Sequence, residues 1–244
     1  MRPCSSVPAR ACPCLWASRA RPWRGENANG VYSANEYLTR INLMKAYREG
    51  YDTPLKISGS AAIIGGGNVA MDAARCAKRM GAEHVYVLYR RDEEEMPARK
   101  EEVHHAKEEG IEFMLLTNPV KVLDDGTGRV GGLECVKMRL TAPDESGRRA
   151  PKVVEGSNFT LEVDTVVMSL GTSPNPLIRS TTPGLETNRK GCLQVDEETM
   201  ATSRPGVYAG GDAVTGAATV ILAMGAGKKA AESMHQYLQE KHSK

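Results

Sequence analysis

The 244-residue chain is 41% hydrophobic and 25% charged, proportions typical of a soluble globular protein with room for one or two domains. No apolar run reaches membrane-spanning length, and a net charge of +2 gives no reason to expect nucleic acid as a partner. The six cysteines form no CxxC pair, so neither a metal site nor a redox dithiol is indicated. We therefore expect a cytoplasmic protein with reduced cysteines that contacts neither nucleic acid nor a membrane.

The first 24 residues differ in composition from the rest. They contain five arginines, four prolines and no acidic residue. The prolines argue against an amphipathic transit peptide, and there is no continuous apolar stretch for a secretory signal. Codons can be chosen that make the shifted reading frame encode a strand and a glycine turn leading into Gly25. We expect residues 1–24 to be either a disordered tail or an out-of-frame segment, without function.

A regular pattern begins at Gly25. Ser33 and Glu36 have the spacing of a capping box, which predicts a helix over residues 34–49 that ends at Gly50. Its apolar residues recur at helical spacing, so its expected role is packing and connection.

Residues 61–75 read AAIIGGGNVAMDAAR and contain the most informative motif of the chain. A short apolar strand is followed by Gly65-x-Gly67-x-x-Ala70 and then by helix formers, the order that a dinucleotide-binding turn requires. Gly65 permits the sharp turn, Gly67 lets a pyrophosphate approach the backbone, and Ala70 keeps the helix close to the sheet. The phosphates are expected at the helix N-terminus, where free N–H groups and the helix dipole favour anions.

A second apolar strand, residues 85–89, follows at the spacing of a βαβ unit and ends in Arg90 and Arg91. An acidic residue at this place holds the ribose 2′-hydroxyl of NAD, whereas arginine accommodates the 2′-phosphate of NADP. The sequence therefore favours NADP(H). The alternative is that both arginines are solvated charges paired with the acidic residues 92–95. Arg99 has the same two interpretations, a 2′-phosphate contact or a solvated side chain.

The middle of the chain is expected to form a helix after Pro97 that ends at Gly110, and then short strands. His104 and His105 are neighbours on that helix and point in different directions, so they are not expected to share a metal ion. The strands are predicted at residues 113–116, 120–123, 132–140 and 159–163, with a polar loop over residues 141–152. Residues 164–170 form a nearly continuous apolar strand that ends at Gly171, a place where ligands bind in doubly wound sheets.

The last 60 residues predict short strands at 193–196 and 207–209, a glycine turn and a helix to about Leu238. Asp212, which follows Gly211 in that turn, is a candidate to bind a polyol hydroxyl, and the alternative is that it caps the turn. Thr219 and Val220 begin the helix, where backbone N–H groups favour an electron-rich oxygen.

Several of these stretches together resemble the small (beta) subunit of NADPH-dependent glutamate synthase. The resemblance runs from about Gly25 almost to the C-terminus and rests on NGVYSANEYLTRINLMKAY, IIGGGNVAMDAARCAKRMGAE, VYVLYRR, EEEMPARKEEVHHAKEEGIEF, LGTSPNP and VYAGGDAVTGAATVILAMGAGKKAA. Related families are the NADPH half of dihydropyrimidine dehydrogenase and the large subunit of the NADH-dependent ferredoxin–NADP reductase.

This resemblance implies an α/β fold with a Rossmann-like NADP-binding domain and part of an FAD-binding domain, as in flavoproteins with two dinucleotide-binding domains. The NADPH-binding domain is expected at residues 58–170, a connecting helix and part of the FAD domain at 25–57, and the C-terminal part of the FAD domain at 171–244. The resemblance places NADPH on Gly65, Gly67, Asn68, Val69, Ala70, Arg90 and Arg91. It places the nicotinamide near Ser169, Gly171 and Thr172, and FAD near Gly211, Asp212, Ala218, Thr219 and Val220.

The implied activity is hydride transfer from NADPH to FAD, followed by electron transfer through iron–sulfur clusters to a partner. The partner is the glutamate synthase large subunit or another electron-accepting subunit, and no catalytic side chain is expected because the cofactors carry the chemistry. The iron–sulfur domain and the glycine fingerprint for the FAD pyrophosphate have no counterpart in this sequence, so we expect an N-terminally truncated member. The alternatives are an NADPH-binding fragment without electron transfer, or the small subunit of a related ferredoxin or pyrimidine oxidoreductase.

Overall fold

The computed structural model describes residues 25–55, 58–145, 147–171 and 174–242. The expectations for residues 1–24 and for Thr172 lie outside these ranges. The described chain forms two compact units, residues 25–170 and residues 171–242. Residues 25–55 lie in the same unit as residues 58–170.

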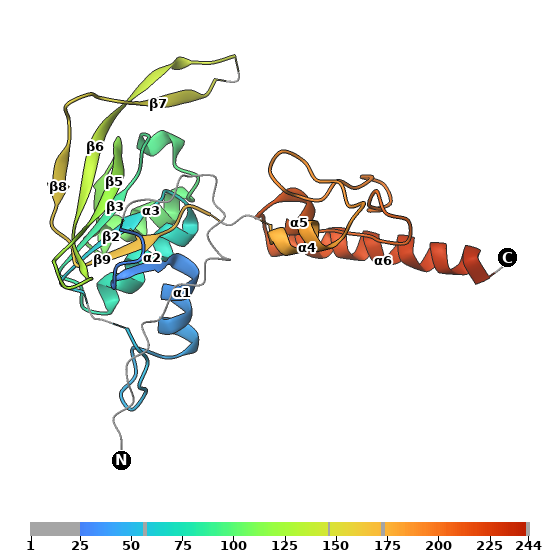
Figure 1. Ribbon diagram of the computed structural model, residues 1–244, viewed down its shortest axis with the longest axis horizontal. Coiled ribbons are helices and arrows are strands. Elements are labelled where there is room, and N and C mark those ends of the chain that lie inside the picture. The colour runs from blue at the N-terminus through green and yellow to red at the C-terminus, as the bar shows by residue number, and fades with distance from the viewer. Residues whose placement is uncertain (1–24, 56–57, 146, 172–173, 243–244) are drawn as a thin grey trace. The chain divides into compact units, whose positions relative to one another are not determined.

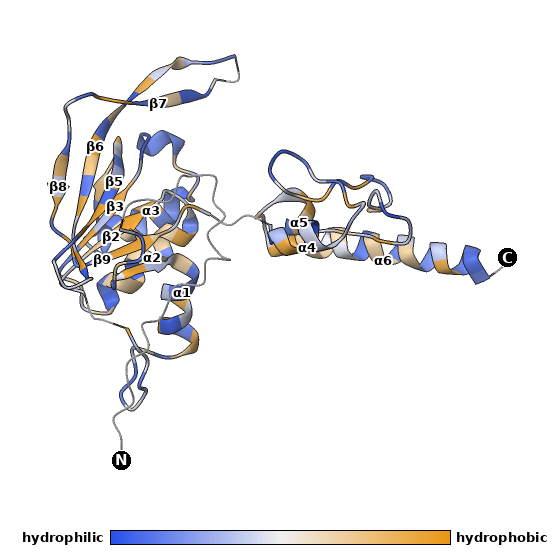
Figure 2. Cartoon of the chain, in the orientation of Figure 1, coloured by the Kyte–Doolittle hydropathy of each residue, from blue (hydrophilic) through white to orange (hydrophobic). Residues whose placement is uncertain are grey.

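The first unit is built on a five-stranded parallel sheet (Figure 1). Its strand order is β1 (Val31–Ser33), β9 (Thr165–Met168), β2 (Ser60–Ile64), β3 (His84–Leu88) and β4 (Glu112–Met114). All four residues of β9 are buried, and four of the five in β2 are buried. Buried parallel strands are mostly apolar because both faces of the sheet are covered. Figure 2 shows the same strands as predominantly hydrophobic.

Helices α2 (Asn68–Arg79) and α3 (Lys100–Glu108) follow β2 and β3. The alanines of α2 form a small-residue face that is buried in the core beside strand residues such as Ile63 and Val87. This face allows the helix to approach the sheet closely. Ion pairs then join the two helices, because Arg75 contacts Glu102 at 3.1 Å and Glu109 at 2.8 Å.

A second, antiparallel sheet is formed by β5 (Thr117–Asp124), β6 (Val130–Pro143), β7 (Arg149–Val153) and β8 (Phe159–Leu161). β6 pairs with the other three strands. The prediction of a loop over residues 141–152 was wrong, because β6 extends to Pro143 and β7 pairs with it. β7 contains a proline and two basic residues, so it lacks the apolar alternation by which a strand is predicted.

The helix predicted over residues 34–49 is shorter than expected. It consists of α1 (Ala34–Leu38) and a π-helical turn (Thr39–Leu43). The Ser33 side chain accepts a hydrogen bond from the Glu36 N–H at 3.2 Å, as a cap should, but the Glu36 carboxylate contacts Arg40 at 2.7 Å. The chain turns after Leu43, where Lys45 has a φ of 54° and the Thr53 hydroxyl bonds to the Met44 carbonyl.

The second unit contains α4 (Pro176–Thr181), α5 (Asp212–Thr215) and α6 (Val220–His242). The helix predicted to end near Leu238 is α6, one turn longer than expected. The strands predicted at 193–196 and 207–209 are isolated bridges, Thr187 with Leu193, Val195 with Thr202, and Ala201 with Tyr208. None of the helices in the described ranges is long and apolar enough to cross a membrane.

Candidate dinucleotide-binding site

The carboxyl ends of β2, β3 and β9 meet at one edge of the parallel sheet. Ile64 is in register with Leu88 on one side and with Met168 on the other. The Gly65 N–H donates to the Leu88 carbonyl at 3.0 Å, and the Ser169 N–H donates to the Ile64 carbonyl at 2.7 Å. The glycine turn, the strand end that leads to the arginine pair, and Ser169 therefore lie together, at the edge where ligands bind in such sheets.

Gly65 and Gly67 of the turn are subject to different constraints. Gly65 has a φ of 141°, and a Cβ there would lie 2.3 Å from the Ser169 carbonyl oxygen, so the fold itself requires glycine. Gly67 has a φ of −95° and a ψ of 174°, and a Cβ there would meet only Pro97, at 4.0 Å. The packing around Gly67 thus leaves room for a side chain, and the open space above the backbone is available to a ligand.

Helix α2 begins at this turn without a side-chain cap. The N–H groups of Asn68 and Val69 are in the first turn of the helix and have no intrahelical acceptor. The Asn68 side chain accepts a hydrogen bond from the Arg99 N–H at 2.9 Å, and the Ala98 N–H donates to the Gly66 carbonyl at 3.0 Å. These bonds hold the start of α3 beside the glycine turn, while Ala70 is fully buried against the sheet.

Arg90 and Arg91 leave β3 at the same edge. Arg90 is exposed and Arg91 is half-buried. The predicted alternative was pairing with residues 92–95, but these acids contact other groups: Glu93 contacts Lys107 at 2.7 Å, and the carboxylates of Glu94 and Glu95 contact Arg149. Within the described ranges neither arginine of the pair forms an ion pair, and the Arg91 Nε is buried without a hydrogen-bond partner.

Ser169 ends the buried strand β9 and is 8% exposed. Its hydroxyl oxygen is buried and has no hydrogen-bond partner among the described residues. A buried polar group without a partner is unfavourable in the folded state unless a ligand or water satisfies it. Its carbonyl oxygen faces Gly65, so Ser169 lies at the glycine turn. Gly171 follows with a φ of 88°.

In the second unit, Gly211 and Asp212 lie at the start of α5, close to α6. A Cβ on Gly211 would lie 3.2 Å from the Cβ of Ala223. Asp212 is exposed, and no described side-chain cap or hydrogen bond uses its carboxylate, so the turn-capping alternative lacks support. The helix turn is closed instead by the N–H groups of Val214 and Thr215, which donate to the Gly211 carbonyl.

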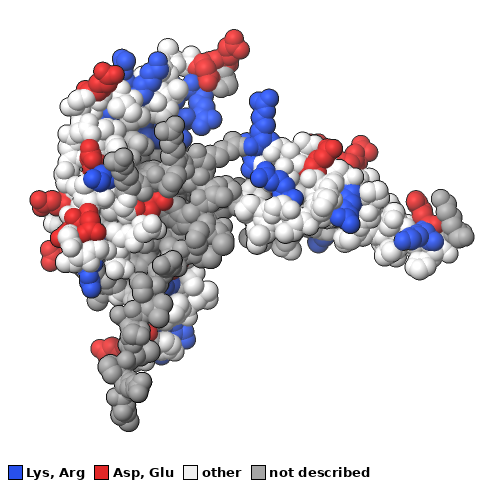
Figure 3. Space-filling view, viewed as in Figure 1, with Lys and Arg blue, Asp and Glu red and all other residues white. Residues whose placement is uncertain are grey.

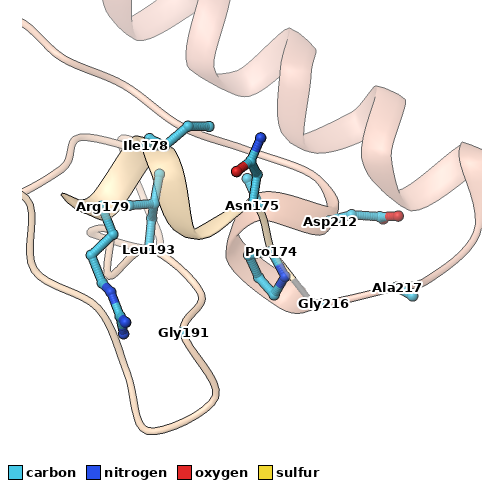
Figure 4. A pocket seen from close by; sticks show the side chains of 10 residues that line it. Pro174, Asn175, Ile178, Arg179, Gly191, Leu193, Asp212, Gly216 and Ala217 are labelled. Atoms are coloured by element: carbon cyan, nitrogen blue, oxygen red, sulfur yellow. The ribbon is translucent and has the colours of Figure 1, made fainter. Parts of the chain in front are cut away.

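Asp212 also lines a cavity of about 220 Å³ (Figure 4). The carboxylate and the Arg179 guanidinium point away from each other in this view. The cavity is also lined by Asn175, Ile178 and Arg179, and no motif in the sequence indicated Ile178 or Arg179 as site residues. Ala218, Thr219 and Val220, at the start of α6, are exposed, with Val220 at 76%.

Two of the cysteines in the described ranges are shielded by burial. Burial raises the pKa of the Cys135 thiol to about 12, and burial also raises the pKa of the Cys76 thiol, so both are unreactive apolar side chains at neutral pH. No cluster of metal-ligating side chains occurs in the part of the chain that the structure describes. His104 contacts Glu108 one helical turn away at 3.3 Å, as expected for a surface residue.

Comparison with known proteins agrees with this geometry. A profile of the pyridine nucleotide-disulphide oxidoreductases matches residues 19–230. The chain belongs to this family. Its fold is similar to that of Mycobacterium tuberculosis FprA in complex with NADPH, with a TM-score of 0.67 at 18% identity, covering 94% of this chain and 62% of that one. The expected Rossmann-like α/β fold is thereby confirmed.

Curated members of the family confirm the resemblance to glutamate synthase. The glutamate synthase [NADPH] small chain of Azospirillum brasilense is 39% identical over 225 residues, which is 89% of this chain and 46% of that protein. The NADP(+)-dependent formate dehydrogenase subunit beta of Moorella thermoacetica is 45% identical over 179 residues, 73% of this chain and 25% of that protein. The chain thus spans about half the length of the glutamate synthase small chain, and a quarter of the formate dehydrogenase subunit.

Proposed function

We propose that the chain binds NADPH at the glycine turn and acts as the NADPH-oxidising part of a flavin oxidoreductase of the glutamate synthase small-subunit type. The observation that carries this proposal is the start of α2, where Gly67 lacks a side chain although the fold leaves space for one, and where no side chain caps the helix. Both features suit an anion that contacts the backbone directly.

In this proposal the pyrophosphate accepts hydrogen bonds from the N–H groups of Asn68 and Val69. The positive end of the α2 dipole adds about 0.3–1 kcal/mol, and up to about 2 kcal/mol in a partly buried site. Arg90 and Arg91 bind the 2′-phosphate, because guanidinium groups without carboxylate partners are available for phosphate oxygens. Arg99, whose backbone is bonded to Asn68, is near enough to the turn to join them.

Ser169 and the following residues are proposed to lie along the nicotinamide half of the cofactor. The Ser169 hydroxyl is then a hydrogen-bond donor or acceptor for NADPH, which would satisfy the buried oxygen. In the second unit, Asp212 is proposed to bind the ribitol and pyrophosphate region of FAD, and Ala218, Thr219 and Val220 the isoalloxazine ring. The Asp212 carboxylate caps no described helix, and the N-terminal end of α6 is exposed, so both are available for these roles.

When bound, NADPH supplies a hydride that FAD accepts and passes on as electrons, and the residues named above bind and orient the two cofactors. The electrons are proposed to reach an iron–sulfur partner subunit, with the glutamate synthase large subunit as the specific candidate. The names of the relatives, subunits of glutamate synthase and of a formate dehydrogenase, support an electron-accepting partner of this kind.

The test is anaerobic spectroscopy of the purified chain. The proposal predicts flavin absorbance that NADPH bleaches and, in the presence of the large subunit, formation of glutamate. A chain that binds NADPH but carries no flavin, even after incubation with FAD, would support the alternative of an NADPH-binding fragment without electron transfer. Bleaching without glutamate formation would favour a related ferredoxin or pyrimidine oxidoreductase.

A further inference from the structure

The hairpin of β6 and β7 is attached to the segment that follows the arginine pair. Arg149, the first residue of β7, contacts the Glu95 carboxylate at 2.5 Å and the Glu94 carboxylate at 3.6 Å. Glu95 is fixed in turn, because it accepts a hydrogen bond from the Asp92 N–H at 3.1 Å and its carbonyl accepts one from the Tyr89 hydroxyl at 2.8 Å. The hairpin therefore contacts the segment that follows β3, although Arg149 and Glu95 are 54 residues apart in the sequence.

Because Arg149 is held in this way, the adjacent Arg148 also lies near the segment that follows β3. Its backbone is held at the hairpin tip by Asp144, which accepts from the Arg148 N–H at 2.9 Å and donates to its carbonyl at 3.0 Å. Burial raises the pKa of Tyr89, and the charges of Arg91, Arg90 and Arg148 oppose this shift, so all three guanidinium groups act on one tyrosine. Figure 3 shows Lys or Arg side chains beside the hairpin, next to acidic groups at its tip.

The three arginines lack the anion that such a cluster favours. In the described ranges, none of the guanidinium groups of Arg90, Arg91 and Arg148 forms an ion pair, and the Arg91 Nε is buried without a partner. The positive charges of the three guanidinium groups repel one another, and a doubly charged phosphate monoester bound between them would offset this repulsion. Guanidinium groups also match the geometry of phosphate oxygens. The ligand that fits is a phosphate on a ribose bound at the adjacent glycine turn.

We propose that the β6–β7 hairpin supplies Arg148 as a further cation for the ribose 2′-phosphate, with Arg149 as the residue that positions it. The inference rests on the proposed function and extends it, because it makes a hairpin outside the parallel sheet a determinant of the preference for NADPH over NADH. Arg148 contacts the phosphate directly. Arg149 acts only through the hairpin, by holding it on Glu94 and Glu95.

The test uses 2′,5′-ADP and 5′-AMP as probes, because they differ only in the 2′-phosphate and need neither flavin nor nicotinamide. Isothermal titration calorimetry is carried out on the full chain and on Arg148→Ala, Arg149→Ala and the double variant. Arg139→Ala is the matched control, since Arg139 is an exposed arginine of the same hairpin that is not among the charges acting on Tyr89.

Arg148→Ala is expected to weaken 2′,5′-ADP binding roughly three- to tenfold, as for loss of one exposed charge-assisted contact, and to leave 5′-AMP binding unchanged. Arg149→Ala should also weaken 2′,5′-ADP binding, and adding Arg148→Ala to it should have a smaller effect than in the parent. Arg139→Ala should bind both probes as the parent does.

Two negative results are distinguishable. If the parent prefers 2′,5′-ADP and Arg148→Ala keeps that preference in full, the role of the hairpin is overturned while NADPH binding stands. If the parent binds both probes equally, the proposed preference for NADP(H) itself is wrong. Equal losses for Arg148→Ala and Arg139→Ala would also overturn the inference, because they would indicate general electrostatic attraction instead of a specific contact.

Discussion

Alanine substitution at Gly65 and at Gly67 is expected to separate the glycine that the fold needs from the glycine that the ligand needs. Gly67→Ala introduces a Cβ that meets only Pro97, at 4.0 Å, on a backbone with ordinary dihedral angles. The smaller entropy of the unfolded alanine chain stabilises by about 0.4–1 kcal/mol. Alanine is a poorer N-cap than glycine by about half a kcal/mol, which offsets that gain. The free energy of unfolding should therefore change by less than about 1 kcal/mol.

NADPH binding, in contrast to stability, should be clearly weakened in Gly67→Ala. The new methyl group would occupy the space through which a phosphate reaches the N–H groups of Asn68 and Val69. Loss of one hydrogen bond to a charged group costs about 1.5–3 kcal/mol, so the Kd of Gly67→Ala for NADPH should rise by at least about tenfold. Thermal unfolding by circular dichroism measures stability, and calorimetric titration measures binding.

Gly65→Ala provides the contrast. Its Cβ would lie 2.3 Å from the Ser169 carbonyl oxygen, at a φ of 141°. Overpacking costs about 1–3 kcal/mol and the backbone strain about 1–2 kcal/mol more, so this variant should lose stability as well as binding. If Gly67→Ala binds NADPH as tightly as the parent does, no phosphate approaches the helix start, and the reasoning is refuted.

Two further predictions concern other parts of the first unit. Ser169→Ala removes a buried hydroxyl without a described partner, so the ligand-free variant should be as stable as the parent or up to about 1 kcal/mol more stable. NADPH should raise the melting temperature of the variant less than that of the parent. An equal increase in both proteins would show that the hydroxyl does not contact NADPH. Glu109 has a lowered pKa because Arg79 hydrogen-bonds to it, with Arg75 contributing. Its stabilising effect is present above the ordinary carboxyl pKa and is lost as the pH falls through the lowered one. Glu109→Gln should therefore be about 0.5–1 kcal/mol less stable than the parent at neutral pH, and the difference should vanish in acid. A difference that persists in acid would indicate a packing effect.

Much of the site could be predicted because it depends on local sequence and on one general property of parallel sheets. The apolar runs of β2, β3 and β9 predicted buried parallel strands, and the carboxyl ends of such strands share an edge. That Gly65, Arg90 and Ser169 lie at this edge follows from the strand order. That Gly67 is free of packing constraints does not, because it depends on where Pro97 lies.

The features that were missed depend on contacts between residues far apart in the sequence or on competing local bonds. β7 was predicted as a loop because its residues do not alternate, and it is held by pairing with β6 and by the contact of Arg149 with Glu95. The helix that begins at Ala34 was predicted too long because the chain turns after Leu43, where Lys45 has a positive φ and the Thr53 hydroxyl bonds to the Met44 carbonyl. Neither outcome can be read from residue spacing alone.

The central claim is that Arg90 and Arg91 bind the phosphorylated ribose of a dinucleotide bound at the glycine turn. Its most direct test is the ratio of the Kd values for NADH and NADPH, measured for the parent and for Arg90→Glu. We predict that the parent binds NADPH more tightly and that Arg90→Glu loses this preference through weaker NADPH binding, with NADH binding little changed. Equal affinities for both cofactors in both proteins would contradict the claim.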